Sequence, residues 1–197
     1  MEIIFNYLYK SMKKILFIIA NLGFQDEEFS IPFDILTAQG HQCEVASWRW
    51  GKCRGVFFKT IEKSLSLDEV QIFDYDLLVF VGGGGAYEEY FQHAKYLQLA
   101  REAKAVAAIC IAPTLLSDAG IYQGKQVTGR DDGFWTQIHY LEKNGALFRD
   151  EEVVQDWNLI TANGPAAATK FAWAIVEYLD NLNRNLILQE KITNDKL

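Results

Sequence analysis

The stretch VAAICIAP, residues 106–113, places a cysteine between a run of apolar residues and a proline. Residues 106–109 are continuously apolar, which predicts a strand that is buried on both faces, as in a parallel sheet. Pro113 suits the first turn of a helix, where its missing N–H is not needed. Cys110 is therefore expected at a sharp turn from strand to helix. The free N–H groups at the start of that helix would favour the thiolate.

The flanking sequence alternates buried strands with helices. Residues 15–20 and 77–81 are further apolar runs that predict central strands. An acidic segment after the first run opens a helix toward Gly40, and a second helix is expected over residues 88–104. The other expected elements are strands at 43–48, 56–59 and 153–161 and helices at 131–144 and 165–182. This alternation predicts an α/β fold with a doubly wound, mostly parallel sheet sandwiched by helices.

Composition and charge limit the class of protein. Half of the 197 residues are hydrophobic, which is enough to build one domain with a sizeable core. A net charge of −7 and a pI near 5.0 disfavour binding to phosphate backbones and anionic lipids, so neither nucleic acid nor a membrane is expected as a partner. The three cysteines, Cys43, Cys53 and Cys110, lack the spacing of a disulfide or zinc framework, which suits reduced thiols in the cytoplasm and no metal.

The chain is expected to have three parts. Residues 13–182 form the domain, residues 1–12 an N-terminal extension and residues 183–197 a polar C-terminal tail. Met12 is a possible initiator, and the first short apolar run is not followed by the small-residue cleavage pattern of a signal peptide. Disorder and a role as a dimer arm are both open for the tail.

Three loops are expected to meet at one edge of the sheet, because ligands of open α/β sheets bind beyond the carboxyl ends of the strands. They are residues 21–28, 82–85 and 110–113. The second loop consists of four glycines and matches neither the phosphate-binding nor the dinucleotide-binding pattern, so no cofactor is expected. The third contains Cys110, which is either a small buried apolar residue or a nucleophilic or redox-active thiol. Its place at the turn favours the second interpretation.

Four segments in order along the chain resemble the DJ-1/PfpI superfamily, also called ThiJ/PfpI and class I glutamine amidotransferase-like. AAICIAPTLLSDAG at 107–120 is similar to the segment around the nucleophilic cysteine of that family. KILFIIANLGFQDEEFSIPFDIL at 14–36, DYDLLVFVGG at 74–83 and NLITANGPAAATKF at 158–171 are similar to its first strand and acidic loop, its glycine-ended strand and its closing helix. The resemblance covers residues 13–181. It implies a flavodoxin-like fold, usually in a homodimer.

The resemblance also implies roles for individual residues. Cys110 would be the catalytic nucleophile, and Glu28, four residues before Pro32, would be its acidic partner. Glu28 would hold a proton and donate it to the sulfur, because two neighbouring anions repel each other. The backbone N–H groups of Gly83 and Ile111 would form an anion hole for a substrate oxygen or an oxidised sulfur.

Other titratable residues have simpler interpretations. Asp26 and Glu27 are expected to be solvated charges at a helix start, and this is also the alternative for Glu28. The histidines are expected to be solvated residues in loops or on helix surfaces, with His93 as the only reserve catalytic candidate. They are His41, His93 and His139.

Two positions depart from the family pattern. Ile111 stands where PfpI-type peptidases carry a histidine, and an apolar side chain cannot relay a proton, which disfavours a peptidase. Arg130 stands where DJ-1-type glyoxalases and deglycases carry a histidine. A guanidinium group is a poor proton shuttle but a good binder of anionic oxygens, so Arg130 is expected in the substrate pocket.

Three functions remain compatible with these residues. The first is a glyoxalase III-like or deglycase-like enzyme in stress protection, in which Cys110 attacks a small reactive carbonyl compound. The second is a non-enzymatic, redox-responsive or chaperone-like dimer in which Cys110 is oxidised in steps. The third, disfavoured by Ile111, is an intracellular cysteine peptidase. The expected partners are a small-molecule substrate and a second copy of the chain.

Overall fold

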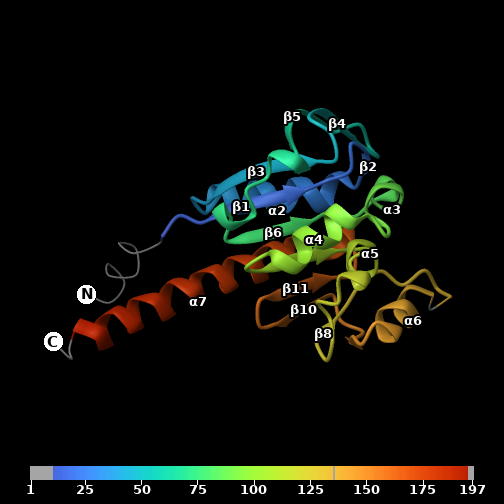
Figure 1. The fold of residues 1–197 in the computed structure, drawn as a ribbon. Coiled ribbons are helices and arrows are strands. Elements are labelled where there is room, and N and C mark those ends of the chain that lie inside the picture. The colour runs from blue at the N-terminus through green and yellow to red at the C-terminus, as the bar shows by residue number, and fades with distance from the viewer. Residues whose placement is uncertain (1–10, 135, 195–197) are drawn as a thin grey trace.

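A mostly parallel sheet of nine strands, flanked by helices, forms the body of the protein (Figure 1). The structure, a computed structural model, describes residues 11–134 and 136–194. The strands of this sheet are β1 (Lys14–Ile18), β2 (Leu22–Phe24), β3 (Gln42–Ser47), β4 (Gly51–Gly55), β5 (Thr60–Ser66), β6 (Leu77–Phe80), β7 (Val106–Ile109), β10 (Val153–Asp156) and β11 (Leu159–Ala162). A separate short pair is made by β8 (Gln126–Val127) and β9 (Leu147–Phe148). The α/β fold class predicted from the sequence is confirmed.

The strand order puts the carboxyl ends of the central strands β1, β6 and β7 side by side. The order is β10-β11-β7-β6-β1-β3-β5-β4-β2, and the six strands from β11 to β5 are parallel. The chain runs from β1 to β3 on one side and later returns to β6 on the other side of β1. The loops after β1 and β6 therefore diverge at a switch point, which is where open α/β sheets form their sites.

Helices cover both faces of the sheet. The α-helices are α2 (Asp26–Ala38), α3 (Gly84–Tyr90), α4 (Ala94–Glu102), α5 (Ala112–Leu115), α6 (Thr136–Lys143) and α7 (Ala168–Asn194). Phe29 of α2 and Phe171 of α7 pack in one buried cluster, whereas Tyr90 of α3 and Tyr96 of α4 pack in the other. None of these helices is long and apolar enough to cross a membrane.

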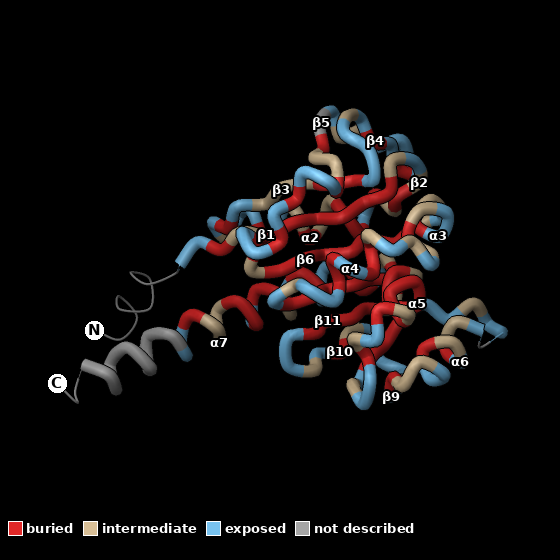
Figure 2. The backbone as a smooth tube through the Cα atoms, viewed as in Figure 1, coloured by how far each residue is buried: buried red, intermediate tan, exposed pale blue. Residues whose placement is uncertain are grey.

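The residues of β1 alternate between the two buried clusters. Ile15 and Phe17 face the cluster of α2 and α7, and Leu16 and Ile18 face the cluster of α3 and α4. All four side chains are fully buried, as expected for a central strand with a layer of helices on each side. Figure 2 shows the same pattern as a buried core along the central strands, with exposed loops around it.

Three helix predictions need correction. The helix expected over 88–104 is two helices, α3 and α4, because the chain turns between them at Gln92, which has a φ of 54°. The helix expected over 131–144 begins only at Thr136. The side chains of Asp131 and Asp132 accept the N–H groups of Gly133 and Phe134, and such local bonds compete with helix formation.

The third correction concerns the C-terminal helix and tail. A 3-10 turn at Pro165–Ala167 precedes α7, and α7 continues to Asn194 rather than ending at residue 182. Asn183 is buried and its Nδ2 donates to the carbonyl oxygen of Ser11 (3.4 Å), so the predicted tail begins inside a packed helix. Most of the predicted N-terminal extension, residues 1–10, lies outside the described residues.

Truncation of a core side chain in α7 should destabilise the protein far more than truncation of an exposed neighbour. Phe171 is fully buried and Trp173, two residues later, is 49% exposed. We expect Phe171→Ala to lower the free energy of unfolding by about 3–5 kcal/mol because it leaves a cavity. Trp173→Ala should change it by less than about 1 kcal/mol. Urea unfolding of both variants checks this, and equal losses would contradict the assigned packing.

Candidate active site

The three predicted loops meet around a cavity of about 390 Å³. Gln25 and Glu28 follow β1 and β2, Gly83 follows β6, and Cys110 follows β7. The other lining residues are Val56, Gly84, Tyr87, Ile111, Arg130 and Pro165. All five residues predicted for the site, Glu28, Gly83, Cys110, Ile111 and Arg130, line this one cavity. Its size is at the lower end of the range for small-molecule sites.

Cys110 occupies a backbone conformation that non-glycine residues rarely adopt. Its φ is +65°, in the left-handed region, and only 4% of its surface is exposed. Its N–H donates to the carbonyl oxygen of Ala162 (2.8 Å), and its own carbonyl oxygen accepts the N–H of Arg130 (2.8 Å). These two bonds hold the strained turn in place, as is common at functional sites. The sharp turn predicted at Cys110 is confirmed.

Glu28 lies on the inner side of the first turn of α2 and is fully buried. The N–H of Gly82, at the end of β6, donates to Glu28 Oε2 (3.0 Å). A Cβ atom at Gly82 would come within 2.7 Å of Glu28 Oε2 and 2.9 Å of Cys110 Cβ, so a side chain would not fit there. Glu28 and Cys110 are thus packed around the same glycine. The interpretation of Glu28 as a plain solvated charge is wrong, whereas Glu27 is exposed as expected.

The carboxyl group and the thiol hinder each other's ionisation. Burial raises the pKa of Glu28 to about 7, although contacts with Cys110, Gly82 and Arg130 act in the opposite direction. Burial, followed by the charge of Glu28, raises the pKa of the Cys110 thiol to about 12, and Arg130 partly offsets this. At neutral pH the pair therefore retains at least one proton between the two groups.

The expectation that a helix start alone favours the thiolate is not supported. The helix after Cys110, α5, contains only four residues, Ala112–Leu115, because a 3-10 turn at Ser117–Ala119 follows it directly. So short a helix contributes little field at its N-terminus, and burial of the thiol dominates.

Arg130, Gly83 and Ile111 complete the wall of the cavity near the thiol. Arg130 interacts with the Cys110 side chain, and its positive charge lowers the pKa of both Cys110 and Glu28. Gly83 has a φ of +110°, and a Cβ atom there would collide with the backbone of residues 23–25. This close approach explains why glycine occurs at this position. The predicted anion hole at Gly83 and Ile111 is a matter of function and stays a prediction.

Two residues that were expected in solvent are buried. Asp26 accepts the N–H groups of Phe57 (2.8 Å) and Lys59 (2.7 Å), and so fixes the turn between β4 and β5 to the start of α2. His41 is 4% exposed, and its Nδ1 accepts the N–H of Lys13 (3.3 Å). Both are contacts between segments far apart in the sequence, which no local pattern indicates.

His93 lies outside the cavity. Its Nδ1 accepts the N–H of Lys95 (3.3 Å) at the start of α4, and its ring packs edge-on against Trp48 with 4.3 Å between the ring centroids. These contacts assign His93 to the structure of α4 rather than to the site around Cys110.

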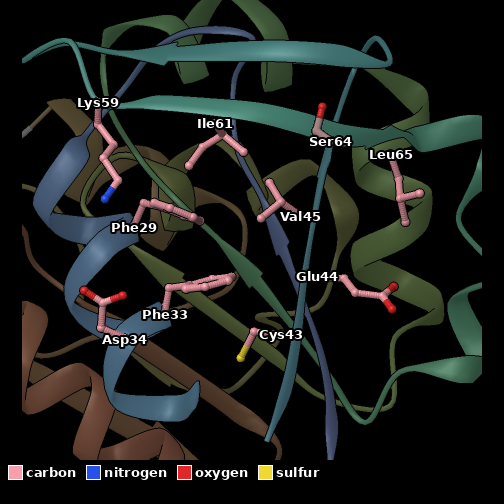
Figure 3. A pocket seen from close by; sticks show the side chains of 10 residues that line it. All are labelled: Phe29, Phe33, Asp34, Cys43, Glu44, Val45, Lys59, Ile61, Ser64 and Leu65. Atoms are coloured by element: carbon pink, nitrogen blue, oxygen red, sulfur yellow. The ribbon is translucent and has the colours of Figure 1, made fainter. Parts of the chain in front are cut away.

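The other two cysteines lie away from this cavity. Cys43 lines a second hollow of about 480 Å³ between α2 and the strands β3 and β5 (Figure 3). Burial raises the pKa of Cys43 to about 11. Cys53 is fully buried in β4, with its sulfur 3.4 Å from Ser64 Oγ. Among the described residues, no group of three His, Cys, Asp or Glu side chains could hold a metal ion.

The mostly parallel sheet flanked by helices places the chain among the flavodoxin-like α/β proteins. The chain belongs to the DJ-1/PfpI family, whose model matches residues 13–178. Deglycase PfpI of Pyrococcus furiosus is 33% identical over 168 residues, which are 81% of this chain and 94% of that protein. An uncharacterised protein of Methanocaldococcus jannaschii is 33% identical over 174 residues, 86% of this chain and 84% of its own.

Solved structures agree with this assignment. The crystal structure of a ThiJ/PfpI domain protein from Brachyspira murdochii matches with a TM-score of 0.81 and 27% sequence identity, and the match covers 87% of this chain and 98% of that one. The resemblance stated from the sequence is therefore confirmed at the level of family and fold.

Removal of the Glu28 charge should change how stability depends on pH. Because the pKa of Glu28 rises from 4.5 to about 7 on folding, the folded state binds more protons between these values and its stability falls as pH rises through them. Glu28→Gln should therefore be more stable than the wild type at pH 8, by up to about 3 kcal/mol, with the difference vanishing toward pH 4.

Chemical denaturation at several pH values measures this difference, with the exposed neighbour variant Glu27→Gln as the control. If the free energies of unfolding of the wild type and Glu28→Gln differ by the same amount at every pH from 4 to 8, Glu28 is not buried as described.

Proposed function

We propose that this protein is a cysteine-dependent enzyme that acts on small reactive carbonyl compounds, as a glyoxalase III or a deglycase does. The observation that carries the proposal is the pairing of Cys110, strained at a φ of +65°, with a buried carboxyl group whose pKa is about 7. A group with a pKa near the working pH is well suited to general acid–base catalysis. Relatives named as deglycases support the same reading.

The first step would be addition of the thiol to an aldehyde. Cys110 Sγ attacks the carbonyl carbon while the Glu28 carboxylate accepts the thiol proton. The carbonyl oxygen becomes negatively charged and is stabilised by the N–H groups of Gly83 and Ile111 and by Arg130. Glu28 then returns the proton to this oxygen, which gives a hemithioacetal with no net change in protons.

The following steps depend on the substrate. For methylglyoxal, the proton on the first carbon moves to the second carbon and the hydroxyl proton moves to the oxygen of the second carbon, which converts the hemithioacetal to a thioester of lactate. Water hydrolyses this thioester to lactate and the free thiol. Glu28, in its ionised form, is the base available for that transfer. For an adduct of an amine with a dicarbonyl, the sulfur would displace the amine, which leaves with the proton that Glu28 took from the thiol.

The alternatives use the same cavity but need other chemistry. In a redox-responsive protein, a peroxide would oxidise Cys110 to the sulfenate and then to the sulfinate. Arg130 and the N–H groups of Gly83 and Ile111 are suited to bind such an anion. A peptidase is disfavoured because Ile111 cannot relay a proton. A homodimer and a cytoplasmic location remain predictions from the resemblance and from cysteine usage.

The purified protein should convert methylglyoxal to lactate. Cys110→Ser should abolish this turnover because no sulfur adduct forms, and Glu28→Gln should lower kcat by about 10²–10⁴ because proton transfer is lost. Cys43→Ser and Glu27→Gln, which change the same residue types outside the cavity, should leave it unchanged. Lactate formation can be followed directly, and turnover that persists in Cys110→Ser, or is absent from the wild type, would refute the proposed function.

A further inference from the structure

The wall of the Cys110 cavity changes in character from its bottom to its mouth. At the bottom, Glu28 is fully buried and Cys110 is 4% exposed. Toward the solvent the cavity is lined by Val56, which is 45% exposed, and by Tyr87, which is 55% exposed. Covering such apolar surface with a ligand is favourable because it removes this surface from water. The reactive thiol therefore lies below an apolar entrance.

The ring of Tyr87 is held in place by a second aromatic ring. It is stacked on the ring of Phe91, with 5.3 Å between the ring centroids and an angle of 10° between the ring planes. Phe91 in turn packs against the buried cluster that contains Tyr90 and Tyr96. Because the Tyr87 ring is supported in this way, a ligand that packs against it pays less entropy for ordering the side chain.

Gly84 leaves open space in the wall of the cavity at the start of α3. A Cβ atom added at Gly84 would meet no heavy atom from elsewhere in the described part of the chain within 4 Å. The cavity of about 390 Å³ therefore has room for a substituent much larger than a methyl group. Methylglyoxal would leave much of this space without contacts, and apolar walls gain dispersion energy only from atoms that touch them.

The polar groups of the cavity are already assigned to the reacting oxygen. In the proposed reaction two backbone N–H groups and the guanidinium group of Arg130 bind the oxygen that becomes negatively charged. Arg130 also interacts with the Cys110 side chain. The aldehyde carbon of a 2-oxoaldehyde has to reach the thiol at the bottom, so the substituent on its ketone carbon is left to face the mouth. Val56 and Tyr87 lie there.

We infer that Tyr87, together with Val56, is a specificity-determining residue and that the cavity selects 2-oxoaldehydes with an apolar substituent of aryl size over methylglyoxal. The inference rests on the proposed function and names its substrate class. The same addition, proton shifts and hydrolysis would convert phenylglyoxal to mandelate. A substituent with a carboxylate is the alternative, because Arg130 could pair with it, but it would bring a charge against apolar side chains that cannot solvate it.

The test measures binding in the Cys110 cavity without turnover. Unreactive amides are added to the protein, and the rate at which iodoacetamide alkylates Cys110 is followed by mass spectrometry, with Cys43 and Cys53 as internal references. The probes share an amide carbonyl group and differ in its substituent. They are benzamide, with a phenyl ring, acetamide, with a methyl group, and oxamate, with a carboxylate.

We expect benzamide to protect Cys110 at about tenfold lower concentration than acetamide, because a phenyl ring removes more apolar surface from water than a methyl group does. Tyr87→Ala should reduce this gap to about twofold, because the apolar surface of the ring is lost. Tyr87→Phe should retain the gap, since it keeps the ring and loses only the hydroxyl group. The control is Phe73→Ala, which removes an exposed ring in the turn before β6, at the other end of the sheet, and should leave the gap unchanged.

Equal protection by benzamide and acetamide, or a gap that survives in Tyr87→Ala, would overturn the inference. Protection by oxamate at a lower concentration than benzamide would overturn it in favour of a substrate whose anionic substituent binds Arg130. Turnover of methylglyoxal without the gap would keep the proposed function and lose this inference. The expected gap without turnover of methylglyoxal or phenylglyoxal would keep the apolar selectivity of the cavity and lose the proposed function, so the two failures are distinguishable.

Discussion

The site depends on one buried carboxyl group, that of Glu28. Its Oε2 accepts the N–H of Gly82 at the end of β6, and the same group interacts with the thiol that follows β7. A fully buried carboxyl is expensive to ionise, which is why its pKa rises to about 7. The Glu28 carboxyl group fits beside Cys110 because three features occur together. They are the start of α2, the absence of a side chain at Gly82 and the positive φ of Cys110.

The sheet brings these parts together by its topology. β1, β6 and β7 are neighbours in the parallel sheet, so the loops at their carboxyl ends share one edge although they are far apart in the sequence. Cys43 provides a contrast within the same protein. It is also partly buried and its pKa is also raised, but it lies in the hollow between α2 and the strands β3 and β5. The side chain that interacts with its thiol is Thr37 rather than a carboxyl group. Position relative to a proton acceptor, and not burial, distinguishes Cys110.

Much of this arrangement could be predicted from the sequence, because apolar runs mark the central strands and the cysteine directly follows one of them. That Glu28, rather than Asp26 or Glu27, lies beside Cys110 could be predicted only through the family resemblance, since three adjacent acids look alike to any local pattern. β2, with three residues, is too short to show periodicity. The contacts of Asp26 with Phe57 and Lys59 join distant segments, so they became visible only in the structure.

The protonation state of Glu28 is the property to measure, because both the coupling to Cys110 and the proposed acid–base role follow from it. Difference infrared spectra between the wild type and Glu28→Gln isolate the band of its protonated carboxyl group. We expect this band to disappear with a midpoint near pH 7, because burial raises the pKa of Glu28 to about 7. A midpoint near 4.5, the value of a solvated carboxyl, would contradict it.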